Sequence, residues 1–212
     1  MGFCTFDYII LEFVGTLKTV WVVGSSIIKD AFIEARTRPG GINLGLQQQN
    51  VSIWWQGRSG MVVGQLKQQI KKMLTFEDPP SVLVIHLAGN DIGRFKIGHL
   101  RNEIKSIMTW LQQELPNTLL VWSQILPRNN WRYSESPKAM EKCRYRLNNS
   151  IATFVLNLGG GYIRYPEILS DKNLIGSDGV HLTTLGTNIL LNTLRGGLDH
   201  FIYRNGNVFP AI

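Results

Sequence analysis

The chain has 212 residues, of which 44% are apolar and 17% charged, and its net charge is +7. This balance is typical of one globular domain with a substantial core. Two cysteines exclude a disulfide framework and a cysteine-rich zinc site, and they favour a reducing compartment. Neither a bilayer-spanning apolar run nor a signal peptide is evident, so we expect a soluble, intracellular and cytoplasmic protein.

Short apolar runs alternate with segments of helical period. The runs predict five buried strands, at 19–23, 51–55, 81–87, 118–122 and 161–163. Apolar stripes predict helices across 62–73, 97–111, 147–158 and 182–194. Strands without alternation between amphipathic helices indicate βαβ units, and so an α/β fold whose parallel sheet is covered on both faces. We expect a domain over 18–203, with an N-terminal extension at 1–17 and a C-terminal tail at 204–212.

In such a sheet the functional loops lie beyond the carboxyl ends of the strands. Ser25 and Ser26 follow Gly24 at the end of the first predicted strand and begin a helix. Backbone amides at a helix N-terminus favour negative charge, so a nucleophilic hydroxyl there has part of an oxyanion hole beside it. On these residues alone, an ordinary helix N-cap explains the serines as well.

Turns that contain glycine follow the second and third predicted strands. Gly60 lies in the first turn, where a glycine lets the backbone turn closely and expose its amides. The second turn is Ala88-Gly89-Asn90-Asp91, in which Asn90 can aim its amide into a cleft and Asp91 can brace the loop. Both segments also fit plain turns. His86, within the third strand, is expected to be a core histidine rather than a ligand.

Asp178 and His181 stand three residues apart in a loop before the last predicted helix. One turn there lets the carboxylate accept the Nδ1 proton and leaves Nε2 free as a base for a serine hydroxyl. An isolated Asp-x-x-His pair also fits a capping interaction or two metal ligands. Together with the earlier strand ends, however, the loops supply a nucleophile, a base, an orienting carboxylate and oxyanion donors.

In order and spacing these blocks resemble the SGNH hydrolase superfamily, the GDSL-like esterases and lipases, from about Val20 to Leu194. The resemblance implies a three-layer α/β/α flavodoxin-like fold with a central, mainly parallel five-stranded sheet. It also implies a serine esterase that needs no metal or cofactor. Some segments, including the one from Ile125 to Arg128, resemble a vertebrate subgroup of SGNH domains associated with transposable elements.

The resemblance assigns Ser26 as the nucleophile, His181 as the base and Asp178 as the carboxylate that orients it. The amides of Ser26 and Gly60 and the side chain of Asn90 then form the oxyanion hole. The implied substrate is a small-molecule ester of an acetyl type, or a short-chain lipid or carbohydrate ester. A flavodoxin-type FMN site is excluded, because the loop after the first strand is too short to cradle a phosphate.

Two positions depart from the family pattern. Ser25 stands where the family has an aspartate, and Ala88 stands where it has a glycine. A serine keeps hydrogen-bonding capacity but no charge, and an alanine tightens a loop that needs a positive φ. These departures motivate an alternative function, a catalytically weakened SGNH domain that binds its ligand or acts as a nucleic-acid-associated accessory module.

Residues 128–146 carry a net charge of +4 with interleaved aromatic side chains. This composition fits weak contact with nucleic acid or anionic lipid, a lid over the cleft, or a solvated face. Arg128 comes directly after the fourth predicted strand and is expected to reach the cleft.

Overall fold

One sheet of parallel strands forms the centre of the computed structural model, which describes residues 17–171, 173–203 and 205–211. The order across the sheet is β2-β1-β3-β4-β5-β6, and every adjacent pair is parallel. The expected N-terminal extension lies outside the described residues except for Leu17. The strands are β1 (Lys18–Gly24), β2 (Val51–Gly57), β3 (Val82–His86), β4 (Leu119–Ser123), β5 (Gly161–Ile163) and β6 (Val208–Phe209).

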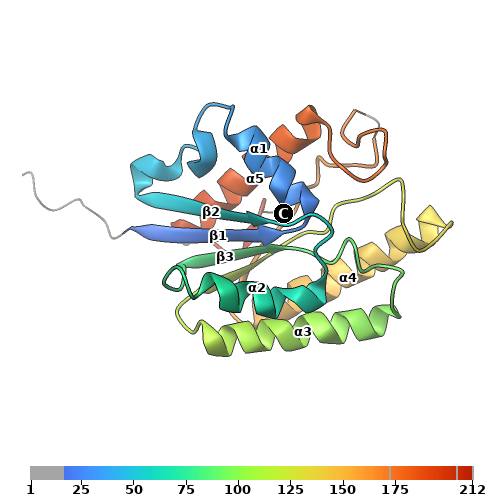
Figure 1. Ribbon diagram of the computed structural model, residues 1–212, viewed down its shortest axis with the longest axis horizontal. Helices are drawn as coiled ribbons and strands as arrows, with labels where there is room; N and C mark the ends of the chain where they lie inside the picture. Colours follow the sequence, from blue (N-terminus) through green and yellow to red (C-terminus); the bar gives the residue numbers. More distant parts are fainter. Residues whose placement is uncertain (1–16, 172, 204, 212) are drawn as a thin grey trace, which may run out of the picture.

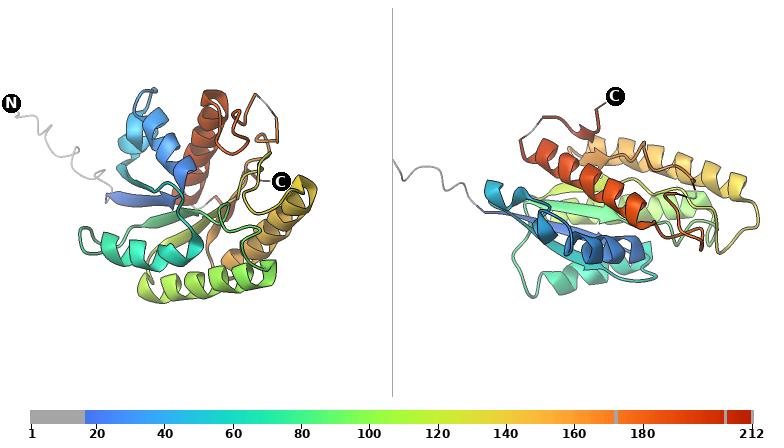
Figure 2. Two further views of the ribbon diagram at one scale, coloured as in Figure 1. Left: turned by 45° about the vertical axis from the view of Figure 1, so that its right-hand side comes forward. Right: turned by 90° about the horizontal axis from the view of Figure 1, so that it is seen from above.

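Helices cover both faces of the sheet, which gives three layers (Figure 1). On one face α1 and α5 lie side by side, and on the other lie α2, α3 and α4 (Figure 2). The helices are α1 (Ser26–Ala35), α2 (Leu66–Met73), α3 (Ile97–Glu114), α4 (Pro137–Asn157) and α5 (Thr184–Ile202). Short 3₁₀ turns are η1 (Gly41–Asn43), η2 (Leu46–Gln49) and η3 (Val63–Gln65). No helix in the described part of the chain is long and apolar enough to cross a membrane.

The sequence of the central strand β1 is a continuous apolar run because both faces of the strand are buried. Val20 and Val22 pack into the core layer beneath α1 and α5, whereas Trp21 and Val23 pack into the layer beneath α2, α3 and α4. Successive side chains of a strand point to opposite faces, and here both faces are covered. The five predicted strands and the parallel α/β fold are therefore confirmed.

Neither the strand β6 nor the first turns of α4 were predicted. β6 adds a sixth strand at the sheet edge, within the segment expected to be a tail, and two residues are too few to show a pattern. Helix α4 begins at Pro137, ten residues before the first residue of its predicted stripe. Its first turns carry mostly polar side chains, and Ser136 caps the helix by accepting a hydrogen bond from the Ala139 amide.

The strand order creates an opening at the carboxyl ends of β1 and β3. From β1 the chain moves to β2 on one side, and it then returns to β3 on the other side. The loops that follow β1 and β3 therefore diverge, which is where open α/β sheets place their ligands.

Candidate active site

Ser26 occupies the first position of α1, and only Ser25 separates it from the end of β1. The preceding Ser25 is extended, with φ −84° and ψ −157°, and its carbonyl accepts hydrogen bonds from the amides of Ile28 (3.1 Å) and Lys29 (3.2 Å). The Ser25 side chain is buried and makes no capping hydrogen bond. Ser26 thus presents its hydroxyl at a helix N-terminus, where the first amides have no partner within the helix.

Asp178, His181 and Ser26 form a continuous hydrogen-bonded row. The His181 Nε2 atom lies 2.9 Å from Ser26 Oγ, across 155 positions of sequence. On the other side of the ring, His181 Nδ1 bonds to Asp178 Oδ2. The second carboxylate oxygen, Oδ1, accepts the amides of Val180 (2.9 Å) and His181 (3.0 Å). The tight turn predicted for this pair therefore holds the imidazole with Nε2 directed at the hydroxyl.

The charge state of Asp178 suits an orienting role. Desolvation alone would raise the pKa of its carboxyl, but hydrogen bonds from the His181 side chain and from the amides of Val180 and His181, together with the His181 charge, lower the pKa to about 2. Asp178 therefore stays ionised at neutral pH and accepts the Nδ1 proton of the imidazole.

Asn90 is held from both ends of its side-chain amide. Its Nδ2 donates to the Met61 carbonyl (3.1 Å), and its Oδ1 accepts from Arg128 Nη1 (3.2 Å). The second bond joins the loop after β3 to the segment after β4, and the first joins it to the loop after β2. In that second loop Gly60 has a φ of +71°, with open space where a Cβ would stand. An Nδ2 group has two protons, so one remains for a ligand.

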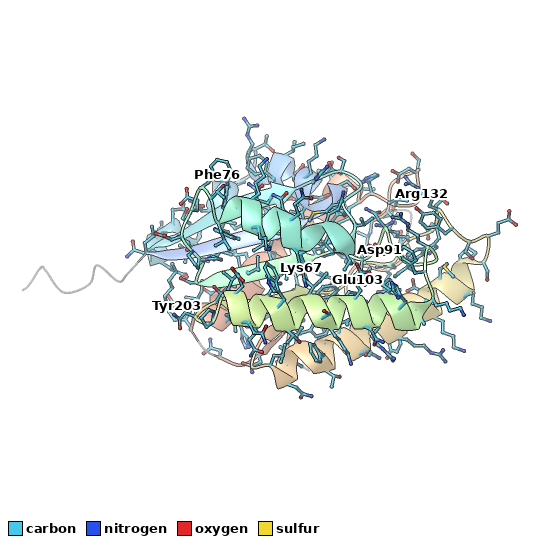
Figure 3. All side chains as sticks on the ribbon, turned by 60° about the horizontal axis from the view of Figure 1, so that its bottom comes forward. Lys67, Phe76, Asp91, Glu103, Arg132 and Tyr203 are labelled. Atoms are coloured by element: carbon cyan, nitrogen blue, oxygen red, sulfur yellow. The ribbon has the colours of Figure 1, made fainter. Side chains whose placement is uncertain are left out.

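Asp91 braces a neighbouring loop. Both of its carboxylate oxygens accept from the Val63 amide, at 3.2 and 3.3 Å, while the side chain is 2% exposed. Burial raises the pKa of the Asp91 carboxyl to about 6, the Val63 amide opposes this rise, and the Glu103 charge adds to it. Figure 3 shows Glu103 on α3, with Asp91 between it and Arg132 in this view.

Ala88 adopts the left-handed backbone conformation, with φ 77°, and is almost completely buried. An L-residue other than glycine is strained in this region by about 1 kcal/mol. Glycine reaches positive φ without such a clash.

A single cleft of about 550 Å³ collects residues from all these loops. Six residues singled out from the sequence line it, namely Ser26, Gly60, Asn90, Arg128, Asp178 and His181. Ser25 and Asp91 lie beside the cleft rather than in its lining. Five further polar or glycine positions also line the cleft although their sequence did not predict it, namely Ser59, Gly89, Asn130, Arg132 and Tyr133.

Most of these further positions lie on the segment between β4 and α4. This segment is fixed to the loop that carries Asp178 and His181, hereafter the triad loop, because the Gly179 carbonyl accepts the amides of Asn129 (2.8 Å) and Asn130 (3.0 Å). Arg132 fell within the basic stretch 128–146, but composition could not distinguish a cleft residue from a surface one. The stretch is not a single surface, because the Arg144 side chain is only 11% exposed, pairs with Glu141 and donates to the Ile125 carbonyl (2.7 Å).

His86 lies in the core, as predicted. It is 4% exposed, its Nδ1 lies 2.9 Å from Ser123 Oγ, and that oxygen lies 2.7 Å from the Tyr165 hydroxyl. Burial and the charge of Arg128 lower the His86 pKa to about 3, so the ring is neutral at physiological pH. Within the described residues, no group of three or more His, Cys, Asp or Glu side chains is arranged to hold a metal ion.

No protein-family model matches the sequence, and no curated protein matches it significantly. Solved structures share its fold. A psychrotrophic esterase from Pseudoalteromonas sp. superposes with a TM-score of 0.68 and 13% identity, covering 88% of this chain and 99% of the esterase. A GDSL-like lipase from Bacteroides thetaiotaomicron superposes with a TM-score of 0.63 and 16% identity, covering 86% of this chain and 88% of the lipase.

An acetylxylan esterase from Geobacillus stearothermophilus gives a TM-score of 0.65 and 15% identity, covering 87% of this chain and 95% of the esterase. The three structures agree with the α/β architecture expected for an SGNH hydrolase. All three come from bacteria, and they lend no support to the resemblance to a vertebrate subgroup.

Proposed function

We propose that the chain is an SGNH-type serine hydrolase that cleaves a small acyl ester. The observation that carries the proposal is the 2.9 Å contact between Ser26 Oγ and His181 Nε2, with Asp178 bonded to the far side of the ring. Nucleophile, base and orienting carboxylate in this arrangement define serine hydrolases on several unrelated folds. The fold shared with esterases and a GDSL-like lipase supports the same reaction class.

In the proposed reaction Ser26 Oγ attacks the ester carbonyl while His181 Nε2 takes its proton. The tetrahedral intermediate collapses, His181 returns the proton to the leaving alcohol, and the acyl group stays on Ser26. Water, deprotonated by His181, then attacks the acyl-enzyme and releases the acid. Asp178 holds the imidazole in the required tautomer and stabilises the imidazolium that forms in each half-reaction.

The oxyanion is proposed to bind the amides of Ser26 and Gly60 and the second Nδ2 proton of Asn90. Three features support this assignment: the helix N-terminus at Ser26, the open space around Gly60, and the fixed orientation of the Asn90 amide. Preorganised donors of this kind stabilise the transition state because they need no reorientation as charge develops.

Hydrolysis of p-nitrophenyl acetate and butyrate tests the proposal. The chain should release p-nitrophenol with saturation kinetics, and Ser26→Ala and His181→Ala should each lower kcat by at least about a thousandfold. Ser59→Ala is the matched control, because it removes a second serine hydroxyl from the same cleft. This control should retain activity well above that of Ser26→Ala.

Circular dichroism should first establish that each variant is folded. Equal turnover by the parent chain and Ser26→Ala would contradict the assignment of the nucleophile. A folded parent chain that turns over neither ester, and that also fails to hydrolyse acetylated glycerol or xylose, would favour a domain that only binds its ligand.

A further inference from the structure

The cleft carries more positive charge than the proposed ester chemistry requires. Two arginines, Arg128 and Arg132, line it, and its one carboxylate is Asp178, which is engaged by His181. Within the residues that the structure describes, neither guanidinium forms an ion pair. A neutral ester would therefore meet two cations without a counterion, which is an unusual lining for a neutral ligand.

Arg128 is held in one place from several sides. Its side chain crosses the backbone of Gly89 so closely that a Cβ there would stand 2.5 Å from Nη2. The guanidinium also lies 5.6 Å from the centre of the Trp131 ring, and Nη1 donates to Asn90. The residue is only 9% exposed. These contacts fix the planar donor group beside the proposed oxyanion donor Asn90.

The charge on this group persists at neutral pH. Burial and the neighbouring Arg132 lower the pKa of Arg128 to about 10, against the opposing effect of Asp178 and Asp91. A buried cation without a paired anion costs free energy, and a bound anion would offset that cost. A guanidinium presents a rigid fork of N–H donors that matches a carboxylate or a phosphate.

Arg132 extends the positive lining toward solvent. It is exposed, and it lies on the segment whose Asn129 and Asn130 amides bond to the triad loop at Gly179. The two arginines are thus on one anchored segment, one deep in the cleft and one toward its outside, and an anion can enter past the exposed residue to the buried one.

We propose that the substrate is an ester that carries an anionic group, a carboxylate or a phosphate, and that Arg128 and Arg132 bind this group while Ser26 attacks the carbonyl. The inference rests on the proposed esterase function and adds a substrate class to it. Both arginines act as specificity-determining residues. The anionic group can belong to the acyl part or to the alcohol part of the ester.

Matched pairs of esters separate these cases. For the acyl part, mono-4-nitrophenyl glutarate is compared with 4-nitrophenyl valerate. For the alcohol part, 1-acetylglycerol 3-phosphate is compared with 1-acetylglycerol, and acetate release is followed. In at least one pair the anionic ester should have a kcat/KM at least about tenfold higher than its neutral partner, which is the usual gain from a charge-assisted pair.

The ratio of kcat/KM for the anionic ester to kcat/KM for its neutral partner, measured in variants, identifies the side chains that cause the preference. Arg132→Gln should reduce the anionic-to-neutral ratio several-fold, and Arg128→Gln should abolish the preference. Arg36→Gln is the control for the loss of one positive charge, because Arg36 lies at the opposite end of α1 from Ser26. If Arg128 served only to orient Asn90, Arg128→Gln would slow both esters equally and leave the ratio unchanged, which would overturn the inference.

Binding gives a readout that does not depend on turnover. Calorimetry should show that the Ser26→Ala variant binds 1-acetylglycerol 3-phosphate or monomethyl glutarate several-fold more tightly than does Ser26→Ala/Arg132→Gln. Binding that is equal in the two variants, together with equal turnover of charged and neutral esters, would refute the anionic substrate but leave the esterase standing. Arginine-dependent binding without any turnover would support the anion site and count against the proposed hydrolysis.

Discussion

Replacing Asp91 by asparagine should raise the free energy of unfolding, relative to that of the parent chain, more at high pH than at low pH. The Asp91 carboxyl is buried and its pKa is raised from 3.8 to about 6. A raised pKa means that the folded chain binds the proton more tightly than the unfolded chain. This stabilisation is therefore present below the unfolded pKa and is lost as the pH rises through about 6.

The magnitude follows from the size of the shift. At about 1.4 kcal/mol per pKa unit, ionising Asp91 in the folded chain costs at most about 3 kcal/mol. Between pH 4.5 and pH 8 the corresponding change in the free energy of unfolding is about 2 kcal/mol, because part of the transition lies below pH 4.5. Asparagine does not ionise, and its side-chain oxygen can still accept the Val63 amide.

Urea unfolding at pH 4.5 and pH 8, followed by tryptophan fluorescence, measures this effect. The difference in free energy of unfolding between Asp91→Asn and the parent chain should move by about 2 kcal/mol in favour of the variant at pH 8. Asp78→Asn removes an exposed carboxylate and is the control for net charge. A difference that is the same at both pH values would refute the argument from burial.

Three other substitutions test the geometry of the site. Asn90→Ala should lower kcat for p-nitrophenyl acetate by about a hundredfold to a thousandfold with a smaller change in KM, because it removes a donor used in the transition state. An equal loss of affinity for substrates and for inhibitors would instead assign Asn90 to binding. Gly179→Ala places a Cβ 2.9 Å from Asn130 Cβ at a φ of +72°, and should cost at least about 2 kcal/mol in urea unfolding. Ala88→Gly should change the free energy of unfolding by less than about 0.5 kcal/mol, because relief of backbone strain at a φ of 77° offsets the lost methyl group. The control Ala31→Gly, at a buried helical position, should cost more than about 1 kcal/mol. Equal costs for the two variants would show that Ala88 is not strained.

The sheet could be predicted from the sequence because each central strand is buried on both faces. Continuous apolar runs such as 82–85 then predict buried strands clearly, and the helical stripes between them leave few alternatives to βαβ units. The strand β6 and the first turns of α4 could not be predicted, because two residues are too few to show a hydrophobic period and polar helical turns carry no apolar stripe.

The hydrogen-bonded row of Ser26, His181 and Asp178 could be predicted, because each of the three stands at a local signal, a strand end or a turn. Arg132 and Tyr133 could not, since they reach the cleft only through the amide bonds that tie their segment to Gly179. The bracing role of Asp91 was expected, but its partner was not, since Val63 lies 28 positions away. Contacts of this range depend on how the loops pack, which single-sequence patterns do not record.

The measurement that tests the central claim most directly is covalent labelling with diisopropyl fluorophosphate, followed by mass spectrometry of peptides. An activated serine is phosphorylated at its oxygen with loss of fluoride, whereas ordinary hydroxyls react far more slowly. We expect one adduct on Ser26 of the parent chain and none on that peptide in His181→Ala. An unlabelled Ser26, or an adduct on Ser59 instead, would contradict the proposed nucleophile.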